Sequence, residues 1–296
     1  MKKTLLFFTL TLVVCLGFLP MTAFAEEAEL PDWYFLFAIF KNVDADCKDE
    51  HNVMRHTKYS MTQDEVNIIR RNARGFEEYM NRVGVMCAHV EVVEIDAVVT
   101  ELQEYDGGSY LEEEHASFLL NGKVDLNRYD HVTCIASLNV GTSFLGLGGG
   151  MFENGTGHAF INFVNRNQGI QWFTYPNSHW PESIYVHEFL HFVERINIKW
   201  GMEFNEHLIG EKFYKLNTDE WKACYTDIIL GRVKGDAETG TGVFPAVWQY
   251  PPHVLRTMHE LTIPSGVTSI GEWAFQGCSA LTKVSIPASV TSITQH

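Results

Sequence analysis

The chain has 296 residues, of which 46% are hydrophobic and 13% aromatic, and it carries a formal net charge of −15. Its length and apolar content exclude a disordered protein and suffice for one sizeable core with a smaller appended unit. The acidic charge repels phosphate backbones and anionic lipid surfaces, so nucleic acids and membrane surfaces are not expected partners.

The first 25 residues have the composition of a secretory signal peptide. Lys2 and Lys3 form a basic start, a long apolar run follows, and Ala23 and Ala25 provide small residues at a cleavage point. A retained membrane anchor is the rival interpretation, because the apolar run is fairly long. The small-residue ending favours cleavage, so we expect a mature chain without a membrane span that is secreted or held at the cell surface.

The cysteine pattern argues against a thiolate metal site. Five cysteines remain after residue 25, and they are scattered with no CxxC pair. A dense disulfide framework is therefore not expected, and the odd number leaves at least one thiol free in the monomer.

The mature chain begins with predicted strands and helices in the order of an α/β domain whose helices pack on a twisted sheet. Aromatic and branched residues over 33–43 predict a buried strand. A helix with a capping threonine is predicted over 61–83, and apolar–polar alternation predicts a strand over 88–99. Further buried strands are predicted over 129–138 and 158–164.

Two more helices are predicted in the second half of this domain. The first covers about 181–199 and is apolar on most sides, so it should be buried. The second covers about 218–231, and the segment 200–217 between them looks irregular. The glycine-rich stretch Gly146–Gly150 lacks the residues of a phosphate-binding loop, so a flexible loop is predicted there.

The first of these helices carries a pattern with clear chemistry: His187, Glu188 and His191 form an HExxH sequence. Residues four apart lie on one face of an α-helix, so both imidazoles can reach one ion. Glu188 is rotated by about 100° and can hold a metal-bound water without binding the ion itself. A pair of ordinary core histidines is the alternative, but such groups are costly to bury without a partner, which favours Zn²⁺.

A zinc site needs a third protein ligand, and the following segment offers several. We predict His207, which gives an all-histidine site, and Glu211 is the main alternative. Glu206 also lies in range, and cages of three histidines or of two histidines and one glutamate are both chemically sound. Tyr214 and Tyr225 are possible donors to a developing oxyanion, but either is equally explained by packing.

The C-terminal part differs in kind. The sequence of 261–270 recurs over 284–293, with a period of 23 residues and six of ten positions identical. Apolar positions repeated at a fixed period, with Pro and Gly at turns, predict a solenoid. The predicted limits are therefore a domain over 26–250, a linker over 251–260 and partial repeats over 261–296.

The HEFLH sequence, on a helix that follows an α/β half, resembles the zincin metallopeptidases, mainly over residues 155–230. The resemblance implies an α+β zincin-like domain that uses zinc to hydrolyse peptide bonds, with Glu188 as the general base. It also implies an edge strand that lines the cleft and pairs with the peptide substrate, a role for His158–Val164. The metzincin continuation is absent, because Glu194 and Asn197 stand where that family has glycine and histidine.

The repeats resemble the leucine-rich repeats of bacterial surface proteins, the BspA-like type, over about 260–296. This resemblance implies a surface or host protein as a partner. Two functions are therefore expected to compete: a secreted zinc endopeptidase, and a non-enzymatic adhesin whose zincin-like domain is structural. Glu188 favours the enzyme, because a structural metal site has no use for a carboxylate at that position.

Overall fold

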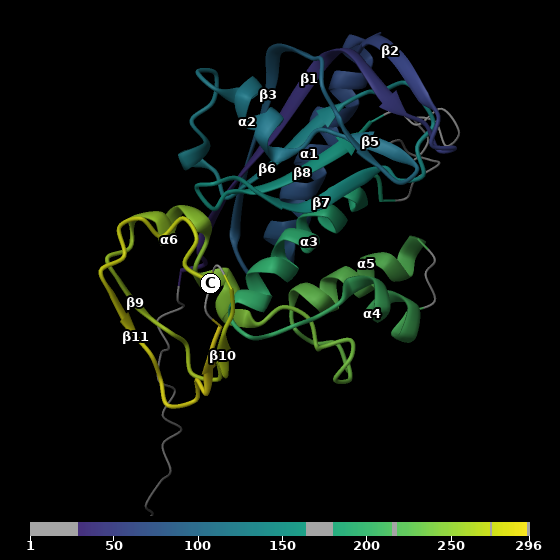
Figure 1. The fold of residues 1–296 in the computed structure, drawn as a ribbon. Coiled ribbons are helices and arrows are strands. Elements are labelled where there is room, and N and C mark those ends of the chain that lie inside the picture. Colours follow the sequence, from purple (N-terminus) through teal and green to yellow (C-terminus); the bar gives the residue numbers. More distant parts are fainter. Residues whose placement is uncertain (1–28, 164–179, 215–217, 273, 295–296) are drawn as a thin grey trace, which may run out of the picture.

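The computed structural model describes residues 29–163, 180–214, 218–272 and 274–294, so the predicted signal peptide lies outside the described residues. The largest sheet in the described part of the chain is a six-stranded mixed sheet, which lies in the upper part of the view in Figure 1. Its strands are β1 (Asp32–Lys48), β2 (Met54–Ser60), β3 (Cys87–Val99), β6 (His131–Ala136), β7 (Gly146–Met151) and β8 (Gly157–Asn162). A small separate hairpin consists of β4 (Gln103–Tyr105) and β5 (Gly108–Tyr110).

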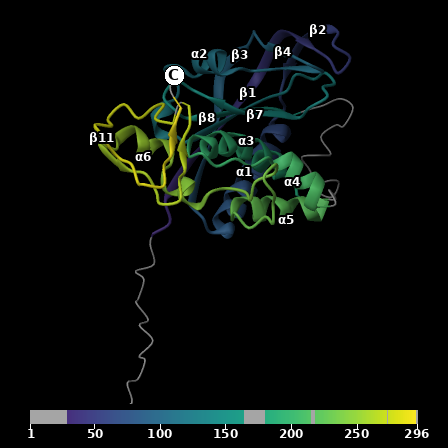
Figure 2. The ribbon, with the colours of Figure 1, turned by 60° about the horizontal axis from the view of Figure 1, so that its bottom comes forward.

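Helices cover both faces of this sheet, as the predicted α/β arrangement requires (Figures 1 and 2). Residues of α1 and α3 share a core with one face, and residues of α2 share a core with the other. The helices are α1 (Gln63–Val83), α2 (Glu113–Leu120), α3 (Ser183–Lys199), α4 (Glu206–Phe213), α5 (Thr218–Ile229) and α6 (Pro252–Thr257), with short 3₁₀ turns at Leu126–Arg128 and Pro245–Gln249. None of these helices in the described ranges is long and apolar enough to cross a membrane.

Strand β1 explains why the predicted strand over 33–43 is apolar throughout. It pairs in parallel with β3 along one edge and with β6 along the other, and helices cover both of its faces. Phe35 and Phe37 join the core beneath α1 and α3, whereas Leu36 and Phe40 join the core beneath α2. A strand buried on both faces shows a continuous apolar run rather than alternation.

The order of the strands shows that the prediction of which strand lies at the edge of the sheet is wrong. The order is β2-β1-β6-β8-β7, so the strand predicted over His158–Val164 corresponds to β8, which lies inside the sheet. The outer strand is β7, formed by Gly146–Met151, where a flexible loop was predicted. Glycine disfavours strands in general, but it is used where another backbone approaches closely, and β7 lies directly against α3.

The predicted helix over 61–83 is confirmed as α1, and its first turn shows why it begins there. The Thr62 hydroxyl accepts from the Glu65 N–H at 3.3 Å, and the Glu65 carboxylate accepts from the Thr62 N–H at 2.7 Å. This capping box satisfies two amide groups at the helix start. Gly84, at φ 78°, ends the helix in the left-handed conformation that glycine adopts without strain.

The repeats pack directly on the end of α3. Strand β9 (Glu260–Thr262) pairs in parallel with β11 (Lys283–Ser285), and β10 (Ser269–Ile270) pairs with β12 (Ser292–Ile293). Both pairs join residues 23 apart, which confirms the predicted period. The Gly271 N–H donates to the carbonyl of Lys199 at 3.1 Å, and Leu261, Ile263, Val267 and Ile270 belong to the same core as α1 and α3.

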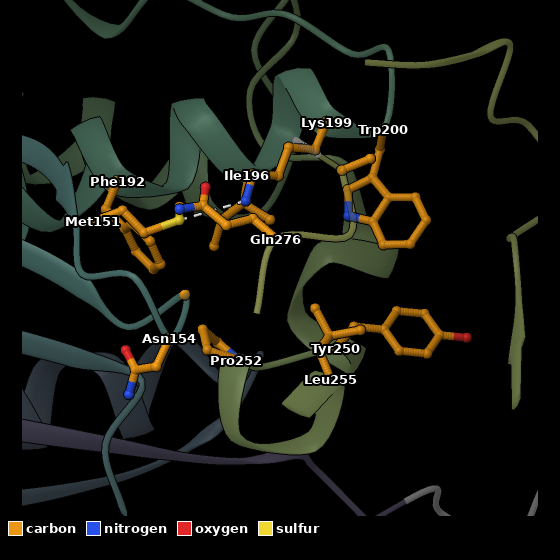
Figure 3. A pocket seen from close by; sticks show the side chains of 12 residues that line it. Met151, Asn154, Phe192, Ile196, Lys199, Trp200, Tyr250, Pro252, Leu255 and Gln276 are labelled. Carbon is orange, nitrogen blue, oxygen red and sulfur yellow. Dashed lines mark hydrogen bonds between the residues drawn. The ribbon is translucent and has the colours of Figure 1, made fainter. Parts of the chain in front are cut away.

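A pocket lies where α3, α6 and the repeats meet (Figure 3). Its walls include Phe192 from α3, Trp200 directly after α3, and Leu255 from α6. The ammonium of Lys199 lies 3.5 Å from the Met151 sulfur, and burial lowers the pKa of this lysine to about 8. The pocket shows that the contact between domain and repeats involves side chains on both sides.

The predicted linker over 251–260 contains α6, which is anchored to the sheet domain. Arg256 is 9% exposed and donates to the carbonyls of Asn127 and Tyr129 at 2.8 and 2.9 Å. It also donates to the Thr156 hydroxyl at 3.0 Å. A buried guanidinium with these acceptors fixes the place where the repeats begin.

Replacing Arg256 with methionine should lower the free energy of unfolding by about 3 kcal/mol, because two carbonyls and a hydroxyl lose a charged donor in a buried place. Urea unfolding followed by tryptophan fluorescence measures this loss. Arg128→Met is the control, because the Arg128 side chain is 67% exposed. Equal stability of the two variants would show that Arg256 does not anchor α6.

Candidate metal centre

Helix α3 presents the HExxH residues on one side of a buried element. The predicted helix over 181–199 is confirmed, and Gly201, at φ 69°, follows its end. The rings of His187 and His191 lie 4.8 Å apart between centroids, and both side chains are partly exposed, at 20% and 23%. The apolar neighbours are buried in the core, so the helix holds the two imidazoles at a fixed spacing on its accessible side.

The segment 200–217 is not irregular as predicted, because it contains α4 (Glu206–Phe213). The Asn205 side chain caps this helix by accepting from the Leu208 N–H at 2.9 Å. Ile209 and Gly210 are buried, and α4 packs against α5. Eight residues give only a weak helical period, so the segment is difficult to recognise from sequence alone.

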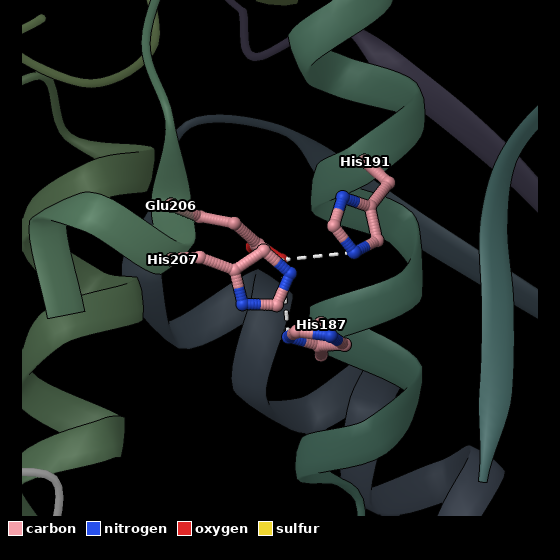
Figure 4. Close-up of side chains that lie close together, drawn as sticks. All are labelled: His187, His191, Glu206 and His207. Atoms are coloured by element: carbon pink, nitrogen blue, oxygen red, sulfur yellow. Dashed lines mark ion pairs between the residues drawn. The ribbon is translucent and has the colours of Figure 1, made fainter. Parts of the chain in front are cut away.

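Helix α4 places Glu206 and His207 opposite the two histidines of α3 (Figure 4). The Glu206 Oε1 atom lies 3.0 Å from His187 Nδ1, 3.2 Å from His191 Nε2 and 3.9 Å from His207 Nε2. All four donor atoms lie within 4.8 Å of one another. Donor atoms of a tetrahedral zinc site are roughly 3.3 Å apart when each is about 2.0 Å from the ion, so this cluster has suitable dimensions.

The Glu206 carboxylate is the deepest member of the cluster. The side chain is 1% exposed, and neither oxygen has a hydrogen-bond partner among the described residues. Burial, with the nearby charges of Glu194 and Glu188, raises the pKa of Glu206 well above its ordinary value. The contacts to His187 and His191 have the distances of ion pairs but not the geometry of hydrogen bonds, so a cation at this place would satisfy the buried carboxylate.

The three candidates for the third zinc ligand differ in burial and in distance from the two histidines of α3. His207, the predicted ligand, belongs to the cluster but lies on its outer side, with 58% of its side chain exposed. Glu211 is exposed and outside the cluster. Glu206, which the sequence indicated only as a residue in range, is the buried donor. The sequence feature that indicates Glu206 is the capping residue Asn205 followed directly by a glutamate, because this pair is typical of the start of a helix.

Glu188 lies beside the cluster and is held by the edge strand. Its side chain is 3% exposed, and its carboxylate accepts a hydrogen bond from the Gly148 N–H. Burial raises the pKa of Glu188 to about 7. Its Oε1 atom is 4.0 Å from His187 Nε2, so the carboxylate faces the same side as the candidate ligands.

The glycines of β7 are explained by this contact. A Cβ atom at Gly148 would lie 2.3 Å from the carbonyl oxygen of Glu188, and one at Gly146 would lie 2.3 Å from its carboxylate. Any side chain there would separate the strand from α3. The glycine-rich sequence therefore allows a backbone N–H to reach the Glu188 carboxylate.

The two tyrosines considered from the sequence lie in different surroundings. The Tyr225 hydroxyl on α5 is 2.8 Å from His187 Nδ1, and burial raises the pKa of this tyrosine. The Tyr214 hydroxyl instead donates to the Asp227 carboxylate at 2.7 Å. Tyr225 therefore belongs to the wall of the site, and Tyr214 is engaged elsewhere.

A second group of metal donors among the described residues consists of Asp32, Cys87 and His89. All three are exposed, and His89 Nε2 already lies 2.6 Å from the Asp32 carboxylate. No buried atom there lacks a partner, so we assign no ion to it. The five cysteines in the described part of the chain are free thiols.

Comparison with known proteins identifies the C-terminal part. Residues 255–296 match the family described as "BspA type Leucine rich repeat region (6 copies)". This match confirms the repeat part of the resemblance, and repeats of this type are typical of bacterial surface proteins and often bind other proteins. It begins inside α6, a few residues before the predicted start at 261. No curated protein and no solved structure matches the chain.

Proposed function

We propose that the chain is a secreted, zincin-like zinc endopeptidase in which His187, His191 and Glu206 hold the metal. The observation that carries this proposal is the buried Glu206 carboxylate, which has no hydrogen-bond partner in the described part of the chain and lies 3.0 and 3.2 Å from nitrogens of His187 and His191. Two histidines and one glutamate form a recognised catalytic zinc cage. Catalytic cages of this kind leave room for a water beside the three protein ligands.

Different residues around the site would have separate roles in peptide hydrolysis. A bound zinc ion supplies a polarised carbonyl and a water of lowered pKa. Glu188 would accept a proton from a water beside its carboxylate and pass it to the leaving amine, and the Gly148 N–H holds that carboxylate in place. Tyr225 and His207 border the same site, because the Tyr225 hydroxyl lies 2.8 Å from His187 Nδ1 and the His207 ring lies 5.1 Å from the His187 ring between centroids.

The position of β7 at the edge of the sheet favours an extended peptide as the substrate. Strand β7 pairs with β8 on one side, and its other edge ends the sheet within the described residues. An extended peptide can add to such an edge through backbone hydrogen bonds, which would bring it alongside α3 and Glu188. The repeats are proposed to bind a surface or host protein and so keep the enzyme near its substrate.

A non-enzymatic adhesin is the second candidate, and one observation favours it. His207 Nε2 lies close enough to Glu206 that all four donors can close around one ion. A closed cage of four protein ligands is typical of structural zinc sites. The contribution of His207 to zinc binding therefore separates the two functions.

The ligand assignment predicts different effects for neighbouring substitutions. The chain from residue 26 onward should bind one zinc ion, Glu206→Gln should lose it, and His207→Ala should retain it. Glu211→Gln is the control, because Glu211 is exposed on the same helix. Metal analysis after dialysis gives the stoichiometry, and digestion of a peptide library reports cleavage.

The other outcomes are equally informative. Equal zinc loss in Glu206→Gln and His207→Ala would indicate a closed four-ligand site. Zinc binding without cleavage of any peptide would favour the adhesin, and a wild-type chain without zinc would refute the metal centre.

A further inference from the structure

Glu194 contacts both elements that carry the candidate ligands, yet it has no role in the proposed chemistry. It lies on α3, one turn after His191, and its side chain is 18% exposed. Its Oε2 atom is 3.1 Å from His191 Nδ1, and its Oε1 atom accepts from the Glu206 N–H at 2.9 Å. One carboxylate therefore links a ligand on α3 to the start of α4.

We infer that Glu194 is a positioning residue that couples the two halves of the metal centre. It acts through His191 on one side and through the backbone of Glu206 on the other, and it does not contact the ion. This inference rests on the metal centre of the proposed function, but not on peptidase activity.

The contact with His191 fixes which ring nitrogen is free. An ionised carboxylate can only accept a hydrogen bond, so the ring hydrogen must be on Nδ1. In the neutral ring, the form that binds a metal, the lone pair is then on Nε2, the nitrogen that lies 3.2 Å from Glu206 Oε1 in the cluster. Carboxylates that orient a histidine ligand in this way also make the ligand nitrogen more basic.

The contact with Glu206 fixes the start of α4. The first amide groups of a helix have no partner inside the helix. The Asn205 side chain satisfies that of Leu208, and Glu194 satisfies that of Glu206. A negative charge is also favourable at this end of a helix.

The two contacts together set the distance between the ligand-bearing helices. The chain between α3 and α4 has no regular structure apart from a turn, and its backbone is bonded at Met202 to Asn197 and at Asn205 to Thr239, neither of which is a candidate ligand. A metal cage requires its ligands to be placed within about 0.5 Å. The direct bond from α3 to the first residue of α4 supplies that constraint.

Glu194→Gln tests this coupling with almost no change in shape. Glutamine has one acceptor oxygen, whereas His191 Nδ1–H and the Glu206 N–H both need an acceptor. One donor must therefore face the amide NH₂ group. We expect zinc affinity to fall about 10–100-fold, as for loss of other groups that orient metal ligands, while the melting temperature of the zinc-free chain falls by no more than a few degrees, the cost of one contact at a helix start.

Competition with a chromophoric chelator measures the affinity, and thermal unfolding is recorded with and without zinc. Glu211→Gln is the matched control, since it removes the same charge from an exposed position of α4. Nitrogen chemical shifts of the His191 ring in the zinc-free chain report whether Nδ1 carries the hydrogen. If Glu194→Gln is not obtained folded, Glu194→Asp keeps the charge but shortens its reach, and the same loss of affinity is expected.

An affinity within twofold of the wild type would overturn the inference and leave the proposed function standing. A lower melting temperature of the zinc-free chain with unchanged affinity would also overturn it, because Glu194 would then be purely structural. Failure of the wild-type chain to bind zinc is a separate result that refutes the metal centre and the inference together.

Discussion

Glu188→Gln is expected to lower kcat/KM for peptide hydrolysis by about 10²–10⁴-fold, the usual contribution of a general base. The amide oxygen of glutamine can still accept from the Gly148 N–H, so the side chain should stay in place beside β7. It cannot take a proton from water. Zinc content should remain at one ion per chain, because Glu188 is not placed among the donor atoms of the cluster.

The measurement combines metal analysis with cleavage of a fluorogenic peptide chosen from the library digestion. Glu211→Gln again serves as the control and should retain both zinc and activity. Activity of Glu188→Gln within threefold of the wild type would remove Glu188 from its role. Loss of zinc together with activity would instead indicate that Glu188 supports the ligand cage.

Much of the fold follows from local patterns in the sequence. The apolar run over 33–43 predicts β1, and the Thr62 capping box predicts the start of α1, because both depend on residues close in the chain. The spacing of His187 and His191 on a buried helix likewise follows from helical geometry. The structure confirms these elements and leaves the chemistry to be tested.

Other features depend on contacts between distant segments. Strand β7 is glycine-rich because α3 passes against it, and nothing within Gly146–Gly150 itself indicates a neighbouring helix. The depth of Glu206 depends in the same way on how α4 packs against α5. Spacing alone placed His207, Glu206 and Glu211 in one range, whereas burial and the direction of each side chain separate them.

The period of the repeats can be predicted from the sequence, but the way in which the first copy packs against the preceding domain cannot. Residues one period apart have different surroundings: Ile270 is 2% exposed, and its counterpart Ile293 is 57% exposed. Ile263 and Ile286 differ in the same way, at 1% and 49%. The first copy is buried against the domain that carries α3, so domain and repeats should unfold as one unit.

Ile270→Ala should therefore lower the free energy of unfolding of the whole chain by about 2–5 kcal/mol, the usual cost of truncating a buried isoleucine. Ile293→Ala makes the same chemical change at the equivalent repeat position and should cost less than about 0.5 kcal/mol, as exposed substitutions do. Urea unfolding followed by tryptophan fluorescence should show one shifted transition for Ile270→Ala. A separate early transition, with the main one unchanged, would show that the repeats unfold independently of α3, since a shared core requires both to unfold together.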